Sequence, residues 1–169
     1  MSAYVVMGVS GCGKSTIASM LASRLHGEFL DADDFHPFAN KQKMAAGIPL
    51  TDDDRWGWLD VLNAELKTRE STGTPVFLAC SALRQIYRDR LATGLPTLQF
   101  IYLRGSKELI RGRLTARHDH FMPPTLLDSQ FATLEEPVNA ITVEIGELPE
   151  VIVEKILRWL QKIRPNKLS

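Results

Sequence analysis

Residues 8–15 read Gly8-Val9-Ser10-Gly11-Cys12-Gly13-Lys14-Ser15 and match the pattern G-x-x-x-x-G-K-[ST]. An apolar run at residues 4–7 precedes them, and apolar residues at helical spacing follow them as far as residue 26. A strand, a glycine-rich loop and a helix in this order form the context in which the pattern binds phosphate. The stretch therefore predicts an α/β fold that holds the phosphates of a nucleotide.

The loop residues have distinct expected roles. Glycines let backbone N–H groups curl around phosphate oxygens, and the N-terminus of the following helix adds its positive dipole end. Lys14 is expected to act catalytically by bridging the β- and γ-phosphates of ATP, and the Ser15 hydroxyl to complete the coordination of Mg²⁺. We expect nucleotide contacts from Gly8, Val9, Ser10, Gly11, Cys12, Gly13, Lys14, Ser15 and Thr16.

Strands and helices are expected to alternate along the rest of the chain. Apolar runs predict strands at residues 28–31, 75–80, 98–103 and 141–145, and helical spacing predicts helices at 37–47, 52–73 and 149–163. Such alternation implies a three-layer α/β fold, with a mostly parallel five-stranded sheet and helices on both faces. We expect a single domain over residues 1–169, with substrate-binding helices at about 36–72 and a lid at about 113–133.

The composition argues against several other classes of protein. The chain has 169 residues, of which 20 are Lys or Arg and 20 are Asp or Glu. It therefore lacks the excess of basic residues expected of a protein that binds nucleic acids or anionic membranes. No apolar run approaches the length of a membrane span, and residues 1–8 lack the features of a signal peptide. Cys12 and Cys80 cannot form a disulfide framework. We expect a cytoplasmic protein that binds neither nucleic acid nor membranes.

Missing motifs narrow the class of nucleotide-binding protein. The Asn-Lys-x-Asp motif of GTPases is absent, since Asn40 and Asn166 begin segments without the aspartate. The strands that end near Cys80 and Leu103 lack the acidic residue that motor and transport ATPases carry there. A compact chain with acidic residues only after its second strand therefore predicts the fold of a small-molecule P-loop kinase.

The second predicted strand ends in an acidic group, Asp31, Asp33 and Asp34, at the edge of the sheet where ligands bind. A kinase needs one carboxylate that accepts the proton of the attacking hydroxyl and another near Mg²⁺. We assign Asp33 as the catalytic base and Asp31 as the metal ligand, and the sequence leaves an exchange of these two roles open. Asp34 is expected to cap the next helix.

Motifs across most of the chain resemble those of the gluconate kinases. They are residues 8–15, Asp31-Ala32-Asp33-Asp34-Phe35-His36-Pro37, Asn40-x-x-Lys43-Met44-x-x-Gly47-x-Pro49-Leu50-x-Asp52-x-Asp54-Arg55, Cys80-Ser81-Ala82-Leu83, Tyr87-Arg88-Asp89, and Arg117-x-x-His120-Phe121-Met122-Pro123 with Ser129-Gln130-Phe131. The resemblance implies a homodimer that uses ATP to convert D-gluconate to 6-phospho-D-gluconate. Cys12, Ala32 and Gly57 depart from the pattern, in which Ser, Gly and Pro are common.

Cations near the three aspartates suit a substrate with one carboxylate and a row of hydroxyls. We expect Asp33, His36, Lys43 and Arg55 to bind D-gluconate. Arg55 suits a two-pronged grip on the substrate carboxylate, whereas His36 and Lys43 suit hydroxyls or the same charge.

The predicted lid adds a second set of polar residues. Arg113 and Arg117 are four residues apart on a predicted helix, so both project from one face toward the phosphates. We assign Arg113 as a nucleotide contact and Arg117 as a catalytic group that neutralises transition-state charge. His120 and Gln130 are expected to contact sugar hydroxyls.

Alternative functions also fit the motifs. Another small-molecule kinase, of the shikimate or nucleoside monophosphate type, shares the architecture, although shikimate kinases usually carry a glycine triplet where this chain has residues 80–83. A non-catalytic regulator that binds ATP is the alternative from a different class. Cys12 also suggests redox control, because a thiol at a helix N-terminus gains thiolate character, unless it is simply a small residue that fills the loop.

Overall fold

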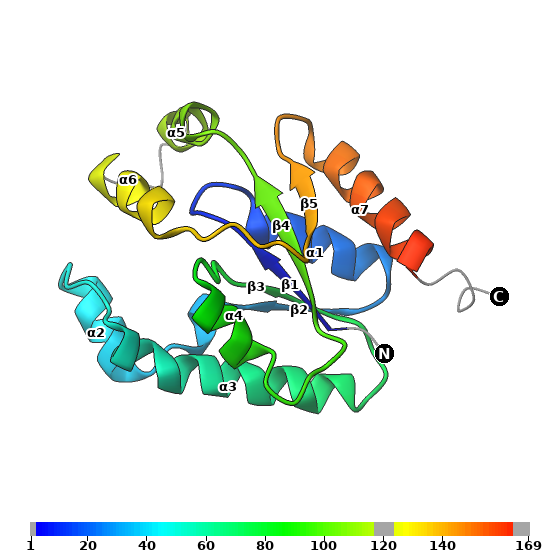
Figure 1. Cartoon of the computed structure of the whole chain (residues 1–169), viewed down its shortest axis with the longest axis horizontal. Helices are drawn as coiled ribbons and strands as arrows, with labels where there is room; N and C mark the ends of the chain where they lie inside the picture. Colours follow the sequence, from blue (N-terminus) through cyan, green and yellow to red (C-terminus); the bar gives the residue numbers. More distant parts are fainter. Residues whose placement is uncertain (1–2, 117–123, 164–169) are drawn as a thin grey trace.

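The protein folds around one parallel sheet. The computed structural model describes residues 3–116 and 124–163. The strands lie side by side in the order β2 (Glu28–Asp31), β3 (Val76–Ala79), β1 (Ala3–Met7), β4 (Gln99–Arg104) and β5 (Ile141–Glu144). All four pairings are parallel (Figure 1). The predicted α/β class and five-stranded sheet are confirmed, and this sheet is parallel throughout.

Helices cover both faces of the sheet (Figure 1). They are α1 (Lys14–Arg24), α2 (Phe38–Ala45), α3 (Asp52–Glu70), α4 (Gln85–Leu91), α5 (Lys107–Ala116), α6 (Pro124–Thr133) and α7 (Pro149–Ile163). Helices α1 and α7 bury their apolar residues against one face, and α3 and α4 against the other. Within the described ranges, no helix is long and apolar enough to cross a membrane.

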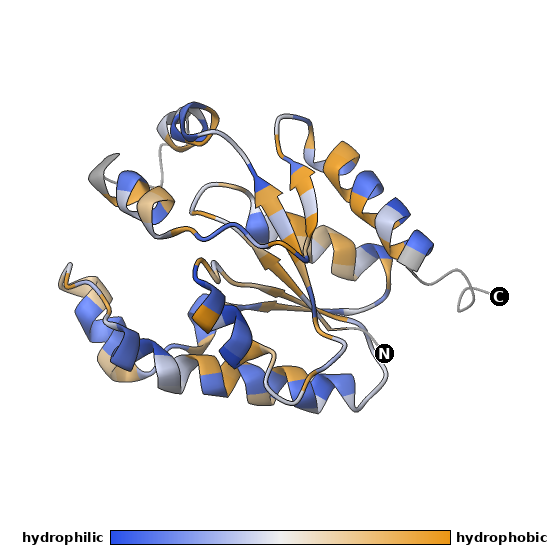
Figure 2. Ribbon diagram, viewed as in Figure 1, coloured by the Kyte–Doolittle hydropathy of each residue, from blue (hydrophilic) through white to orange (hydrophobic). Residues whose placement is uncertain are grey.

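The central strands are apolar because both of their faces are covered. Along β1, Val5 and Met7 belong to the core cluster that contains Leu62 of α3, whereas Val6 belongs to the cluster that contains Leu21 of α1. Figure 2 shows this hydrophobic centre between helices whose outer faces are hydrophilic. Such a continuous apolar run is expected for a parallel strand packed on both sides.

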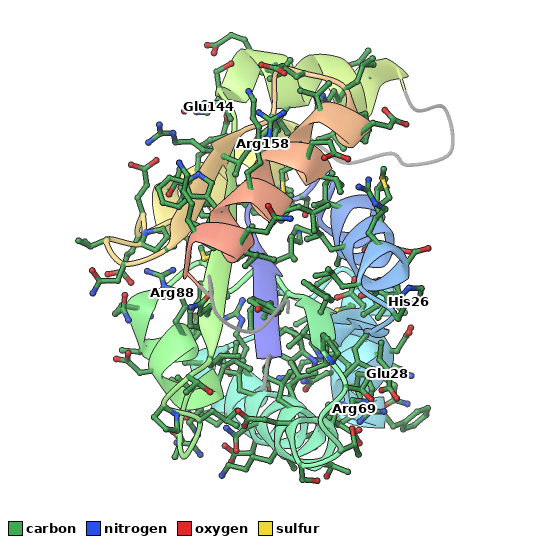
Figure 3. All side chains as sticks on the ribbon, turned by 90° about the vertical axis from the view of Figure 1, so that its right-hand side faces the viewer. His26, Glu28, Arg69, Arg88, Glu144 and Arg158 are labelled. Atoms are coloured by element: carbon green, nitrogen blue, oxygen red, sulfur yellow. The ribbon has the colours of Figure 1, made fainter. Side chains whose placement is uncertain are left out.

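Helix α1 ends two residues before the predicted boundary. His26, labelled in Figure 3, adopts a left-handed φ of 53°, which cannot continue a right-handed helix. Gly27 follows, and a Cβ atom there would lie 2.4 Å from the Pro75 carbonyl oxygen. The chain therefore turns at this point to enter β2. In Figure 3, Glu28 of that strand lies beside Arg69 of α3, with which it forms an ion pair of 2.7 Å.

The turn after β2 corrects one prediction. Residues Ala32–Phe35 form a short 3₁₀ helix, η1, and its N-cap is Asp31, whose side chain accepts a hydrogen bond from the Asp33 N–H. Asp34 caps neither this turn nor α2, whose N-cap is Pro37 and has no side-chain cap. The predicted cap at Asp34 was wrong because the chain turns immediately after the strand, which brings the Asp31 carboxylate to the first free N–H groups.

Two glycine substitutions test this packing in opposite directions. Gly27→Ala should lower the free energy of unfolding by about 1–3 kcal/mol, because the added methyl group overlaps the Pro75 carbonyl. Gly57→Ala should raise it by about 1 kcal/mol, because Gly57 lies inside α3 and its Cβ would meet no atom within 4 Å beyond its chain neighbours and the backbone of its own helix. Urea unfolding of both variants measures the two changes. A shift of the same sign in both would contradict this description of the turn.

Candidate active site

A cleft of about 830 Å³ opens at the carboxyl ends of the strands. Its wall combines the phosphate loop, η1, the start of α3, the loop after β3 and residues of α6. Helices α2 and α6 lie on opposite sides of this end of the sheet (Figure 1). A cleft of this size has room for a nucleotide and a small second substrate.

The phosphate loop has the backbone geometry that the glycines predict. Gly8, Gly11 and Gly13 have φ values of 148°, 84° and 94°, a region that other residues rarely adopt. The Lys14 Nζ donates a hydrogen bond of 3.2 Å to the Val9 carbonyl, which keeps the ammonium group over the loop. Helix α1 starts at Lys14, so its N-terminus faces the same space.

Ser15 and Asp31 lie together at the floor of the cleft. The Ser15 hydroxyl donates a hydrogen bond of 3.1 Å to Asp31 Oδ2. A hydroxyl and a carboxylate are oxygen ligands of the kind that Mg²⁺ prefers. Among the described residues, no group of three or more His, Cys, Asp or Glu could hold a metal. A magnesium ion here would therefore take its other ligands from nucleotide phosphates and water.

Asp33 and His36 face each other across the cleft wall. His36 Nε2 lies 4.0 Å from Asp33 Oδ1, and the His36 ring stacks on Trp58 with centroids 4.1 Å apart. Desolvation in the cleft and the Asp31 carboxylate raise the pKa of Asp33. Burial lowers the pKa of His36, whose side chain is only 4% exposed. The two groups therefore form an acceptor and donor pair next to the phosphate loop.

Arg55 lines the cleft and is held by two side chains. It donates hydrogen bonds to the Tyr87 hydroxyl at 3.2 Å and to Asp52 at 3.4 Å, and it lies 5.4 Å from the centre of the Tyr87 ring. The Tyr87 hydroxyl in turn donates to Asp52. Tyr87 was given no role from sequence, although the Tyr87-Arg88-Asp89 motif was a signal for it. Its ring fixes the guanidinium that faces the substrate space.

Hydrogen bonds from Arg88 hold the loop after β3 in place. Ala82 has a left-handed φ of 47°, a conformation that costs energy for a residue with a side chain. Arg88, which is 2% exposed and labelled in Figure 3, donates hydrogen bonds of 2.7 Å to the carbonyls of Ala82 and Glu135. It thereby ties this part of the cleft wall to the chain that leaves α6.

Lys43 is turned toward α3 instead of the cleft. Its Nζ donates to both carboxylate oxygens of Asp54, at 2.8 and 3.0 Å, and it is not part of the cleft wall. Asp54 also accepts a hydrogen bond from the Thr51 N–H, which completes a capping box at the start of α3. The geometry thus gives Lys43 a structural partner and offers no support for its predicted substrate contact.

The pairing of Asp54 predicts a pH-dependent loss of stability. The hydrogen bond from Lys43 is the main cause that lowers the pKa of Asp54 to about 2. Because this value is below the ~3.9 of an unfolded chain, the stabilisation is complete above about pH 4 and is lost as the pH falls toward 2. Asp54→Asn should therefore lower Tm by a few degrees near neutral pH, and the difference from wild type should shrink over that acid range. Thermal melts across the range measure it, and a constant difference would contradict the prediction.

Gln130 contacts the phosphate loop directly. Its Oε1 accepts a hydrogen bond of 2.7 Å from the Ser10 N–H, and its Nε2 donates one of 2.8 Å to the Ser10 hydroxyl. Arg113, by contrast, donates to the Ile145 carbonyl and does not line the cleft. Of the other predicted lid residues, Arg117 and His120 lie outside the described residues.

Cys12 does not have the environment that redox control requires. It is 1% exposed, and burial raises its pKa despite the nearby Lys14 ammonium. A Cβ on Gly8 would lie 2.7 Å from the Cys12 sulfur, so the thiol fills the space beneath the loop. The expected thiolate character was therefore wrong, because burial outweighs the positive charges around the sulfur, and the alternative of a small filling residue holds.

The predicted site residues that the structure describes separate into three groups. From the loop, Ser10, Gly11, Gly13, Lys14, Ser15 and Thr16 line the cleft. From elsewhere, Asp31, Asp33, His36, Arg55 and Gln130 line it too. Gly8, Val9, Cys12, Lys43 and Arg113 are described but lie away from the wall, the first three beneath or within the loop.

The open cleft on the parallel sheet combines a phosphate loop with the Asp33 carboxylate and the Arg55 guanidinium. This combination defines a small-molecule P-loop kinase. Comparison with known proteins agrees: residues 4–137 match the model of the AAA domain family. The chain is 44% identical to the thermoresistant gluconokinase of Escherichia coli (strain K12) over 163 residues, which cover 94% of this chain and 93% of that protein. The chain belongs to the gluconokinase family.

Solved structures support the same assignment. The crystal structure of a gluconokinase from Sinorhizobium meliloti 1021 has a TM-score of 0.88 and 40% identity, and the match covers 98% of this chain and 94% of that one. A shikimate kinase from Aquifex aeolicus vf5 has a TM-score of 0.60 over 97% of this chain and 99% of its own, at 18% identity. The second likeness shows a shared fold alone.

Proposed function

We propose that this protein transfers the γ-phosphoryl group of ATP to D-gluconate and releases 6-phospho-D-gluconate and ADP. The observation that carries the proposal is the similarity to gluconokinases over nearly the whole chain, at 44% identity to the Escherichia coli protein. The cleft supports it independently, because a phosphate loop and an acceptor site share one wall.

Asp33 and Lys14 are assigned the chemical steps. Asp33 accepts the proton of the C6 hydroxyl as its oxygen bonds to the γ-phosphorus and the bond to the β-phosphate oxygen breaks. Lys14 offsets the negative charge on the phosphate oxygens during the transfer. When bound, Mg²⁺ supplies further positive charge there, with Ser15 and Asp31 as its protein ligands. Arg117 remains a predicted phosphate contact, whereas the position of Arg113 gives no support for its predicted contact with the nucleotide.

Arg55 is the proposed partner of the gluconate carboxylate. Its guanidinium lines the cleft, and Asp52 and Tyr87 hold it in place. A planar guanidinium can form two parallel hydrogen bonds with a carboxylate. His36 and Asp33 are then available for hydroxyls further along the substrate. His120 and Gln130 remain predicted sugar contacts.

A coupled assay of ADP release tests the function. ATP and Mg²⁺ are supplied with D-gluconate, shikimate, AMP, related sugar acids or no acceptor. Strong ADP release with D-gluconate and formation of 6-phospho-D-gluconate support the proposal. Faster turnover with shikimate or AMP would assign the protein to another kinase activity, and ATP binding without turnover would favour a regulator.

A cytoplasmic homodimer is the proposed state of the protein. A cytoplasmic location is consistent with Cys12 and Cys80, both of which are free thiols. A dimer is supported by the family resemblance and by large apolar side chains at the surface, including Leu148 at 70% and Trp159 at 49% exposure. Light scattering coupled to gel filtration measures the mass, and a monomer at micromolar concentration would contradict the dimer.

A further inference from the structure

Asn40 is a buried polar residue that connects α2, α3 and the cleft. Its side chain is almost completely enclosed, at 3% exposure for the residue. The Asn40 Nδ2 donates a hydrogen bond of 2.9 Å to the carbonyl oxygen of Asp54. The same nitrogen lies 3.3 Å from Nδ1 of His36.

These two contacts fix which way the amide faces. A backbone carbonyl can only accept a hydrogen bond, so the amide nitrogen of Asn40, and not its oxygen, must face Asp54. That nitrogen carries two hydrogens, and the second is directed at His36. Because Nδ2 has no lone pair to offer, His36 Nδ1 must be the acceptor of this hydrogen bond.

The consequence concerns the proton on the His36 ring. A ring nitrogen that accepts a hydrogen bond carries no hydrogen, so a neutral His36 has its proton on Nε2. Nε2 is the atom that faces Asp33, at 4.0 Å from Oδ1. The stacked ring of Trp58, whose own Nε1 donates to the Ala32 carbonyl at 2.8 Å, holds the imidazole in this plane.

The charged form of His36 is disfavoured by the same contact. An imidazolium would direct an N–H at the amide hydrogens of Asn40, which is repulsive. Burial, Lys41 on α2 and Arg55 on α3 also favour the neutral ring, and Asp33 in η1 opposes them. The neutral ring can therefore offer one N–H donor to the cleft.

We propose that Asn40 is a positioning residue that holds His36 as the neutral Nε2–H tautomer, so that this N–H donates to a hydroxyl or carboxylate oxygen of the sugar acid bound beside Asp33. This inference rests on the proposed function for the identity of the substrate. The His36 N–H and the Asp33 carboxylate then give a donor and an acceptor, which suits the polyhydroxylated chain of a sugar acid.

Histidine spectroscopy tests the tautomer directly. Long-range ¹⁵N–¹H correlation spectra of the full-length protein distinguish Nε2–H, Nδ1–H and doubly protonated rings, and a His36→Gln variant assigns the signal among the four histidines. Wild type should show Nε2–H near neutral pH. Asn40→Asp replaces the donor by an acceptor and should move the signal to Nδ1–H or the charged ring. Asn40→Ala should give a mixture of tautomers.

Kinetics with a matched control completes the test. Asn40→Ala should lower kcat/KM for D-gluconate about tenfold and leave the KM for ATP within about twofold, the scale expected for one hydrogen bond. Asn63 is the control: it is 8% exposed and likewise donates two hydrogen bonds, of 2.8 and 2.9 Å, to the carbonyls of Leu91 and Thr93. Asn63→Ala should lower Tm but change neither the His36 signal nor the kcat/KM for D-gluconate.

Several results would overturn the inference. An Nδ1–H or charged His36 in wild type, or an unchanged tautomer in a folded Asn40→Ala variant, would show that Asn40 does not set the proton. Equal losses for ATP and D-gluconate would indicate a structural role alone. If wild type does not use D-gluconate, the proposed function and the substrate contact fail, and the spectra still decide whether Asn40 sets the tautomer.

Discussion

Asp33→Asn should lower kcat by about 10²- to 10⁴-fold, the range that general base catalysis contributes. The amide retains the size of the side chain, but it cannot take a proton from the attacking hydroxyl. ATP binding should stay within about twofold of wild type, because Asp33 is assigned to the acceptor hydroxyl and not to the phosphates. Steady-state kinetics with D-gluconate and ATP titration of the variant measure the two quantities.

Two neighbouring aspartates serve as controls for this result. Asp34→Asn should be nearly neutral, because Asp34 is exposed and caps no helix. Asp31→Asn should instead raise the Mg²⁺ concentration needed for half-maximal activity, since Asp31 contacts Ser15. If Asp33→Asn kept near-normal turnover and Asp31→Asn lost it at saturating Mg²⁺, the two roles would have to be exchanged.

Lys14→Met should lower kcat by about 10³-fold or more. The variant keeps a side chain of similar length but removes the positive charge that offsets negative charge on the transferring phosphoryl group. The free energy of unfolding should change little by comparison, because within residues 3–116 and 124–163 the Lys14 ammonium makes one hydrogen bond, to the Val9 carbonyl. Rapid-quench measurement of one turnover with saturating ATP separates the chemical step from binding.

The control for Lys14 is an exposed lysine outside the cleft wall. Lys41→Met on α2 removes the same charge, and Lys41 does not line the cleft. Its kcat should stay within about twofold of wild type. A Lys14→Met variant with wild-type kcat and weaker ATP binding would assign Lys14 to binding alone.

Local patterns were sufficient to predict most of the fold. The strands at residues 4–7 and 28–31 were predicted correctly because their apolar residues are bounded by glycines or aspartates. The start of α3 was predicted correctly from helical spacing, and the structure shows that Thr51 caps it in a capping box with Asp54. Asp34 was predicted to cap the next helix, whereas Asp31 caps η1, a turn that the sequence analysis did not predict. Three of the four residues 31–34 are aspartates, so the sequence pattern does not distinguish them. The turn of the backbone decides which carboxylate reaches a free N–H.

The site was predicted less completely than the fold. Ser15, Asp31 and Asp33 were found because they follow strands or belong to the phosphate loop, where the backbone itself positions them. Asn40 and Tyr87 were missed as functional residues because each acts through another side chain. A motif shows that such residues are present but not which group they hold.

The sequence by itself determined the phosphate loop, the order of strands and helices and the kinase family, because these depend on residues close together in the chain. Only the tertiary structure decided which cations line the cleft and which groups stay buried. Arg55 forms a hydrogen bond with Tyr87, 32 residues away in the sequence, and Gln130 forms one with Ser10, 120 residues away. Lys43 instead forms a hydrogen bond with Asp54. Such choices depend on the geometry and burial of groups that folding brings together, and no local pattern contains that information.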